Sequence, residues 1–301
     1  MIAFGISISG AEAYRLYGQP GVNSAAEASS EIYAFAGVGT TGRTYNLILD
    51  AAQARDDLEA LVLVHPNTEI VDPEFCAKVR RELSDPNVGV VGCAGATRVR
   101  SIAWWEGSVV RAPITWSYGE HGGGELPGIS WAHTEPPPAE VESLDGQLLV
   151  LSPWVVRNLR FDEAPLVDHG FDVDFSLQVR AAARKLVVAD LRVTYHRSLE
   201  LVPDLEIWTE AHIRVAEKWD GALTRAPEDE DGWKRRARLA EARREAARAS
   251  AFSEALKLDA RVLELERDLA DTLDSLSWRV TAPLRTVNRW RKVAATRRSG
   301  R

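Results

Sequence analysis

Acidic, amide and imidazole side chains occur in short segments whose spacing suits the chemistry of a charged leaving group. In the segment LVHPNTEI, His65 and Asn67 lie two residues apart where an apolar run ends, and Glu69 follows. Enzymes stabilise a departing diphosphate with a divalent cation held by carboxylates or imidazoles, or with fixed positive charge. His65 and Asn67 are therefore candidate metal ligands, and the alternative is that a lone histidine is structural.

A second acidic segment, LVDHGFDVDFSLQVR, places Asp168, Asp172 and Asp174 at the start of a predicted helix. A carboxylate there is favoured by the helix dipole and by capping, which is the alternative explanation for at least one of the three. A catalytic base must be ionised and within hydrogen-bonding distance of a hydroxyl. Asp172 is the first candidate for such a base and Asp174 the second.

Two further features suit a sugar or phosphate ligand. His196, in RVTYHRS, follows the last apolar strand and can close a metal or phosphate site from the opposite side, unless it is a buried, satisfied histidine. Tryptophans are dense, and sugar C–H faces pack well on indole rings, although indoles also fill cores. Trp104 and Trp105, in IAWWEG, are the candidates for ligand contact.

The elements that must position these residues alternate along the first third of the chain. Apolar runs predict buried strands at residues 2–8, 31–37, 58–65 and 88–96, and apolar spacing predicts helices at 44–55 and 72–85. Asp72 is a predicted N-cap, with Pro73 at the first helical position. This alternation predicts an α/β fold with a mostly parallel sheet, whose ligands bind beyond the carboxyl ends of the strands.

Residues 96–140 are rich in glycine, proline and tryptophan, which predicts a long irregular loop or a lid. A strand is predicted again after residue 141, followed by a helix and a strand over 171–190. The globular part is expected to span 1–221, a linker and long helix 222–276, and a basic amphipathic tail 277–301.

The long helix carries an apolar stripe with three- and four-residue spacing, interrupted by Thr272: Ala255, Leu258, Val262, Leu265, Leu269 and Leu276. This spacing predicts a short coiled coil and a homo-oligomer, with one solvated helix folding back on the domain as the alternative. The tail mixes Trp278 and Trp290 with arginines, which suits an anionic membrane surface, and a disordered basic tail is the alternative.

Composition narrows the class of protein. The chain has 301 residues, 45% of them hydrophobic, which is enough for a sizeable core. A net charge of -7 gives no reason to expect nucleic-acid binding. The two cysteines form no disulfide framework, and no signal peptide or membrane span is recognisable. We therefore expect a cytoplasmic protein, peripheral on the inner face of the plasma membrane.

Taken together, these segments resemble the GT-A-fold glycosyltransferases of family 2, and more closely a subgroup related to a streptomycin-biosynthesis glycosyltransferase-like domain. The resemblance covers about residues 1–221. The segment GTTGRTYNLILDAA looks like the turn and first helix of the family, with Asn46 at the asparagine position. LEALVLVHPNTEIVDPEF looks like its strand, metal motif and following helix.

The resemblance also assigns roles on the acceptor side. VESLDGQLLVLSP is similar to the acceptor-side strand, with Asp145 and Gly146 at its turn, and HGFDVDFSLQVR is similar to the helix that carries the base. By that match Asp172 is the catalytic base and His196 the late histidine of a metal site with His65 and Asn67. The implied cofactor is Mg²⁺ or Mn²⁺, and Asp174 joins the implied ligand-binding residues.

Two departures from the family pattern matter. Asn67 stands where the subgroup tends to keep a carboxylate, and an amide oxygen binds a hard cation more weakly. Phe171 stands where a glutamate usually precedes the base. We therefore expect Arg43, Arg98 or Arg100 to supply compensating positive charge.

The resemblance implies an inverting transfer of a hexosyl or deoxyhexosyl group from a nucleoside diphosphate sugar to a glycan or lipid-linked acceptor. The motif SLSWRVTAPLR looks like one found beside coiled coils in surface-polysaccharide enzymes, which indicates a cell-envelope pathway. The alternatives are a catalytically degenerate glycan-binding domain and an adaptor that recruits enzymes to a membrane. A nucleotidyltransferase is disfavoured, because no lysine-bearing glycine-rich loop follows the first strand.

Overall fold

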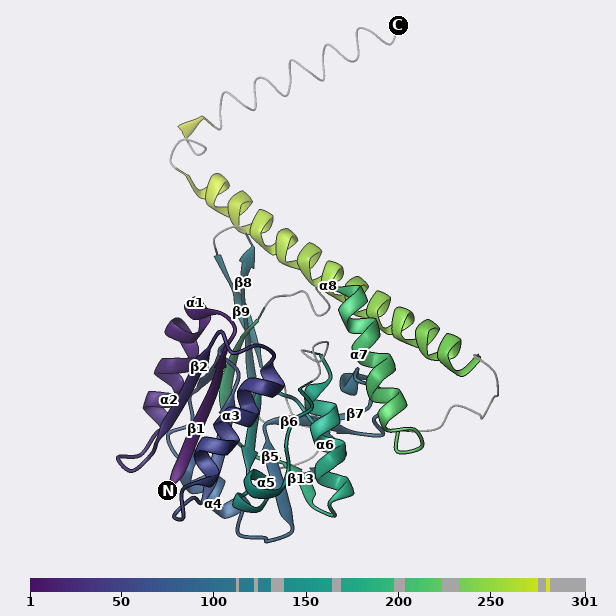
Figure 1. The fold of residues 1–301 in the computed structure, drawn as a ribbon. Coiled ribbons are helices and arrows are strands. Elements are labelled where there is room, and N and C mark those ends of the chain that lie inside the picture. Colours follow the sequence, from purple (N-terminus) through teal and green to yellow (C-terminus); the bar gives the residue numbers. More distant parts are fainter. Residues whose placement is uncertain are drawn as a thin grey trace, which may run out of the picture.

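The structure, a computed structural model, describes residues 1–111, 114–121, 124–130, 138–163, 169–197, 204–223, 233–275 and 280–281. A seven-stranded sheet forms the centre, and two smaller sheets and the helices surround it (Figure 1). The predicted α/β fold, with a mostly parallel sheet, flanking helices and a helical C-terminal extension, is confirmed. The predicted basic tail and Asp168 lie outside the described residues, apart from positions 280–281.

The central sheet has the strand order β10-β13-β5-β12-β3-β1-β2. Its pairings make β1, β2, β3, β5 and β13 parallel to one another, whereas β12 and β10 run in the opposite direction. The strands are β1 Ile2–Ile8, β2 Ile32–Ala36, β3 Ala60–Val64, β5 Val88–Gly92, β10 Ala139–Val141, β12 Leu148–Leu151 and β13 Lys185–Val188. The sheet is thus mostly parallel, as predicted.

Helices pack on both faces of this sheet, among them α2 and α4 on one face and α3 and α5 on the other. The helices of the described residues are α1 Ala11–Ala13, the π-helix η1 Tyr14–Gly18, α2 Gln19–Ala25, α3 Thr41–Gln53, α4 Phe75–Glu82, the 3-10 helix η2 Trp104–Glu106, α5 Pro153–Asn158, α6 Phe171–Ala181, α7 Leu205–Lys218 and α8 Trp233–Asp274. The predicted start of α4 is wrong. The N-cap is Glu74 instead of Asp72. Asp72 lies two residues before the N-cap, and its side chain accepts the backbone N–H of Glu74 at 3.0 Å.

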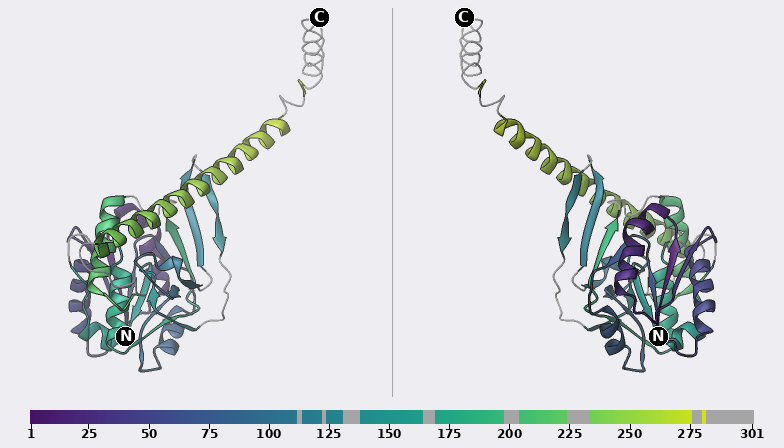
Figure 2. Two further views of the ribbon diagram at one scale, coloured as in Figure 1. Left: turned by 90° about the vertical axis from the view of Figure 1, so that its right-hand side faces the viewer. Right: turned by 90° about the vertical axis from the view of Figure 1, so that its left-hand side faces the viewer.

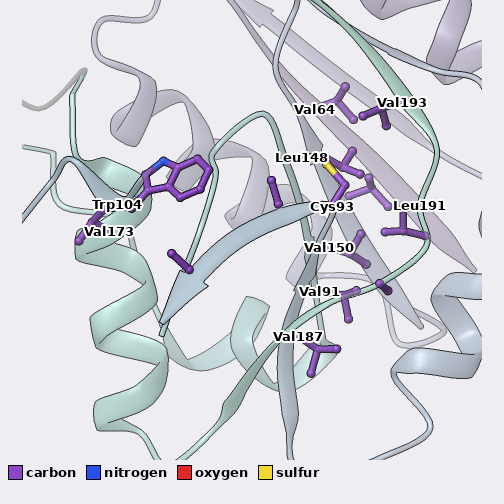
Figure 3. Packing of buried hydrophobic residues seen from close by; sticks show 14 of the residues in the cluster. Val64, Val91, Cys93, Trp104, Leu148, Val150, Val173, Val187, Leu191 and Val193 are labelled. Atoms are coloured by element: carbon purple, nitrogen blue, oxygen red, sulfur yellow. The ribbon is translucent and has the colours of Figure 1, made fainter. Parts of the chain in front are cut away.

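The alternation of strand side chains divides the core into two layers. Leu61 and Leu63 of β3 face the layer formed with α3 and α5, whereas Val62 and Val64 face the layer formed with α2 and α4. Figure 3 shows part of the second layer, where Val64, Leu148 and Val193 lie near one another and Trp104 lies beside Val173. Because every residue of β3 is buried, the end of this strand is a rigid support for the segment that begins at His65.

The prediction of an irregular segment over 96–140 is wrong for its described residues. A three-stranded sheet joins β11 Ser143–Leu144, β6 Ala94–Thr97 and β7 Ser108–Arg111. A four-stranded sheet joins β4 Thr68–Ile70, β14 Val193–Arg197, β8 Ile114–His121 and β9 Gly124–Ser130. Two register shifts between β8 and β9 show how a glycine-rich sequence is accommodated in a hairpin.

Helix α8 lies against the body with its first half and extends past it with its second half (Figures 1 and 2). Ala242, Ala246 and Ala249 are buried, whereas Leu258 and Leu269 are 66% and 58% exposed. The first half of α8 therefore packs on the domain, as in the alternative interpretation of the sequence. The apolar stripe that predicts a coiled coil lies on the second half and is exposed. Among the described residues no helix is long and apolar enough to cross a membrane. The domain boundaries and the coiled coil stay predictions.

Candidate functional site

The candidate site lies where two neighbouring strands of the central sheet meet at one edge. Strand β3 ends at Val64, and the antiparallel β12 begins at Leu148, which is directly opposite in the register. His65 then donates its backbone N–H to the carbonyl of Gln147 at 3.0 Å. The topology thus places the predicted metal segment beside the predicted acceptor-side turn.

The turn at Asp145 and Gly146 is built to approach helix α6 closely. Asp145 Oδ1 accepts the backbone N–H of Gln147 at 3.1 Å, which closes the turn. Gly146 donates its N–H to Asp172 Oδ2 at 3.1 Å. A Cβ at Gly146 would lie 2.5 Å from the ring of Phe171 and 3.3 Å from the Cβ of Asp172. Any larger residue would push the turn away from the carboxylate.

Asp172 occupies the first turn of α6, which begins after Gly170 in the left-handed conformation with φ 75°. Its Oδ1 accepts the N–H of Val173 at 2.9 Å, so each carboxylate oxygen has one backbone donor. Burial and, to a smaller extent, the neighbouring charge of Asp145 raise the pKa of Asp172, and hydrogen bonds from backbone amides lower it; the net result is a pKa of about 7. A carboxylate with this pKa can take a proton near neutral pH.

The three predicted metal ligands come from adjoining segments. Asn67 donates its backbone N–H to His65 Nδ1 at 3.2 Å, and its carbonyl accepts the N–H of His196 at 2.9 Å. His65 also packs edge-to-face on Tyr195, with ring centroids 5.6 Å apart. The backbone thus brings His65, Asn67 and His196 together, as the sequence predicts.

The side chain of His196 already has two partners that sequence reasoning missed. Its Nε2 lies 3.0 Å from Glu69 Oε2, and its ring stacks on Tyr17 with centroids 3.6 Å apart and planes at 7°. Glu69 follows the metal segment directly, so its position was a usable signal. Tyr17 lies about 180 residues from His196 in the sequence, and nothing in its own segment indicates this contact.

These side chains do not form a preformed metal site. Among the described residues, no three histidine, cysteine, aspartate or glutamate side chains are grouped so as to hold an ion. One nitrogen of His65 accepts an amide proton, and His196 is paired with Glu69. The metal-ligand roles of His65, Asn67 and His196 stay predictions, and the chemistry proposed for Asp172 does not depend on a metal.

Two predicted ligand-binding residues hold the scaffold together in this structure. The amide of Asn46 donates to the carbonyl of Phe161 at 3.0 Å and to Glu163 at 2.8 Å, and accepts the N–H of Phe161 at 2.8 Å. Asp174 is 2% exposed. It accepts hydrogen bonds from Gln178, Lys218 and Trp219 and so ties α6 to α7.

The remaining predicted residues differ in accessibility. Arg43 is exposed on the first turn of α3. Trp104 is 5% exposed and packs in the core, and Trp105 is partly buried against Trp208 with centroids 5.5 Å apart. The structure thus gives Trp104 a packing role, and ligand contacts of Arg43, Trp104 and Trp105 stay predictions.

Tyr45 is a residue of this site that sequence reasoning missed. The side chain is fully buried, and its hydroxyl has no hydrogen-bond partner among the described residues. Burial raises its pKa, and the neighbouring Tyr195 and Asp172 add to that effect, which places the hydroxyl in the surroundings of both. A buried hydroxyl without a partner costs about 1–3 kcal/mol. A bound ligand or water beside Asp172 would supply the missing partner.

Tyr45→Phe is therefore expected to leave the melting temperature unchanged or raise it, because the change removes an unsatisfied group. If the hydroxyl serves the ligand, the same change lowers ligand affinity about three- to tenfold, the value of a typical hydrogen bond. Thermal melts and ligand titration measure both effects. Tyr33→Phe is the matched control, because its hydroxyl already donates to Glu31. Equal ligand affinity in the two variants would exclude a ligand contact of Tyr45.

The chain is similar to a protein of known name and, more distantly, to solved structures. The chain is 26% identical over 203 residues to the streptomycin biosynthesis protein StrF of Streptomyces griseus, covering 66% of this chain and 67% of that protein. This match confirms the resemblance that the motifs predict. No protein-family model matches the chain.

The structural likenesses are weaker. The mannosyltransferase PcManGT of Pyrobaculum calidifontis, solved with GDP-Man and Mn²⁺, has a TM-score of 0.44 and 12% identity, covering 95% of this chain and 84% of that one. Protein A197 of STIV has a TM-score of 0.37 and 14% identity, covering 65% of this chain and 81% of that one.

Proposed function

We propose that this chain is a glycosyltransferase that moves a sugar from a nucleoside diphosphate sugar to a glycan or lipid-linked acceptor, with inversion, in cell-envelope polysaccharide synthesis. The observation that carries the proposal is the state of Asp172. Its carboxylate lies at the edge of the central sheet where the parallel strands end, and it accepts hydrogen bonds from two backbone amides. Its pKa is about 7. The similarity to StrF, a protein of streptomycin biosynthesis, supports it.

In the proposed reaction, Asp172 accepts the proton of an acceptor hydroxyl. The hydroxyl oxygen forms a bond to the anomeric carbon while the bond from that carbon to the diphosphate oxygen breaks, and the diphosphate leaves with the electron pair. The backbone amides of Gly146 and Val173 keep both oxygens of Asp172 oriented and retain one lone pair on each for the proton. Attack from the face opposite the diphosphate gives inversion.

The donor diphosphate is proposed to lie at the segments of His65, Asn67 and His196, at the end of β3. A divalent cation, when bound, would neutralise charge on the diphosphate. The amide of Asn67 and the pairing of His196 with Glu69 make such a cation weakly held at best. The exposed Arg43 is the proposed source of additional positive charge from α3.

An adaptor without catalysis is the second candidate, because the second half of α8 exposes apolar side chains well away from the site. Leu258, Val262, Leu265 and Leu269 are each at least half exposed. Such a surface suits recruitment of another protein chain or a second copy. The two candidates differ in whether the domain binds a nucleoside diphosphate.

A thermal-shift panel tests the proposed function. The purified chain is melted with UDP, dTDP, GDP and CDP, each with and without Mg²⁺ or Mn²⁺. We expect one diphosphate to raise the melting temperature, because a ligand that binds only the folded state stabilises it by mass action. A shift that needs the cation and is lost in His65→Ala would support the metal roles. No shift with any diphosphate would favour the adaptor.

A further inference from the structure

A cavity of about 430 Å³ lies between α8 and the segment that follows β6. Its volume falls within the usual range for a small-molecule site. Its lining includes four arginines, Arg98, Arg100, Arg244 and Arg248, and two glutamates, Glu241 and Glu245. The convergence of four guanidinium groups on one cavity is the feature that needs explanation.

The four arginines converge from two elements that are distant in sequence. Arg98 and Arg100 lie between β6 and η2, whereas Arg244 and Arg248 lie one turn apart on the same face of α8. All four are exposed, so they are accessible to a ligand. Among the described residues, no carboxylate lies within ion-pair distance of Arg98, and Arg244 has only Glu241 at 3.7 Å.

The second carboxylate of the cavity is committed to the fold. Glu245 is 4% exposed and accepts the hydroxyl of Ser101 with both oxygens at 2.9 Å. It also lies 3.3 Å from Nδ1 of the buried His212 on α7. These contacts fix α8 to the body and hold the two arginine-bearing walls at a set separation. Glu245 therefore contributes little to neutralising the guanidinium groups.

The wall that carries Arg98 is also held in an unusual conformation. Arg98 has φ 58°, a left-handed value that costs free energy for a side chain of this size. The next residue, Val99, donates its N–H to Glu142 at 3.0 Å, which holds the segment in place. Ile102, further along, packs against Gly170 at the start of α6, so the cavity wall is continuous with the element that carries Asp172.

We propose that this cavity binds a diphosphate-sized anion through Arg98, Arg100, Arg244 and Arg248. Guanidinium groups pair with phosphate oxygens in bidentate fashion, and several of them around one cavity repel one another until an anion is bound. The donors come from both α8 and the domain, so the anion also bridges the two. The site uses neither Asp172 nor the predicted metal ligands, although Arg98 and Arg100 are two of the residues expected from the sequence to supply positive charge, and its binding of a free anion does not depend on the proposed function.

Isothermal titration of the full chain with inorganic pyrophosphate at low ionic strength tests this proposal. The double variant Arg98→Ala and Arg244→Ala removes one guanidinium from each wall and is expected to weaken binding at least about tenfold, since two charge-assisted contacts are lost. Arg261→Ala with Arg267→Ala is the matched control. Both residues are exposed on α8 outside the cavity, and this control should bind as the unaltered chain does.

The double variant Arg98→Lys and Arg244→Lys keeps the charge and removes the bidentate geometry, and we expect its affinity for pyrophosphate to be intermediate. Equal weakening in the Arg261 and Arg267 control, or no binding of pyrophosphate to the unaltered chain, would overturn the site. Titration with nucleoside diphosphates identifies the source of the anion. Loss of their binding in the Arg98 and Arg244 variant assigns the cavity to the donor, and retained binding assigns it to a different phosphate-bearing ligand.

Discussion

Asp172→Asn is expected to lower the turnover number by about 10²–10⁴-fold, the usual contribution of a general base. The amide has the shape of the carboxylate, and its oxygen can still accept the N–H of Gly146 or of Val173, whereas its NH₂ group cannot accept the other. We expect the remaining hydrogen bond and the surrounding packing to keep the turn and α6 in position. Donor binding measured by titration should therefore be unchanged. Asp56→Asn, on the exposed surface, is the matched control and should keep full activity.

The pH profile separates a base from a merely structural carboxylate. If Asp172 acts when ionised, the catalytic rate rises with pH and levels off above about 7. Asp145→Asn removes the neighbouring charge that raises this pKa, so it should move the rising limb to lower pH. An Asp172→Asn enzyme with full activity, or a profile without a limb near neutrality, would contradict the assignment.

Lys78→Met is expected to cost about 3–5 kcal/mol of folding free energy at pH 7, because it leaves a buried carboxylate without its counterion. Lys78 is 6% exposed and donates to Asp72 at 2.7 Å and to the carboxylate and carbonyl of Asp190 at 3.0 and 2.8 Å. This pair joins α4 to the chain that leads into β14, and β14 carries His196.

Urea denaturation measures this cost, and its pH dependence is a second readout. Burial opposes ionisation of Asp72, but hydrogen bonds from Lys78 and two backbone amides outweigh it and lower its pKa. The penalty of Lys78→Met should thus shrink as pH falls and Asp72 takes up a proton. Lys185→Met is the control, since its pair with Asp85 is exposed and should contribute less than about 1 kcal/mol. Equal costs in the two variants would contradict the prediction.

Periodicity in the sequence was sufficient to predict the central elements. The apolar run that becomes β3 is buried on both faces, and α3 places Tyr45, Ile48 and Leu49 inward with the predicted helical spacing. The segment 96–140 could not be predicted in the same way. Its strands pair with β11, β13 and β14, so the contacts that decide its structure come from other parts of the chain.

The candidate site likewise has features that local sequence pattern predicts and features that it does not. The positions of His65 and Asp172 follow from local pattern, because one ends a buried strand and the other begins a helix. The environment of Asp172 depends on Gly146, which approaches from 26 residues away, and the orphan hydroxyl of Tyr45 is recognisable only once the core is closed. Three-dimensional contacts, which a single sequence does not record, determine these properties.

The raised pKa of Asp172 makes the folding equilibrium itself a proton-linked process. Below about pH 4 the carboxyl is protonated in both folded and unfolded chains and favours neither. Between about pH 4 and pH 7 the carboxyl is ionised in the unfolded chain but still protonated in the folded chain. The free energy of unfolding therefore falls as the pH rises through this range and is constant above it. The ionised form that would perform catalysis is the one in which the fold is less stable. A ligand that binds the folded chain beside Asp172 would offset part of this loss, because binding to the folded state alone stabilises it.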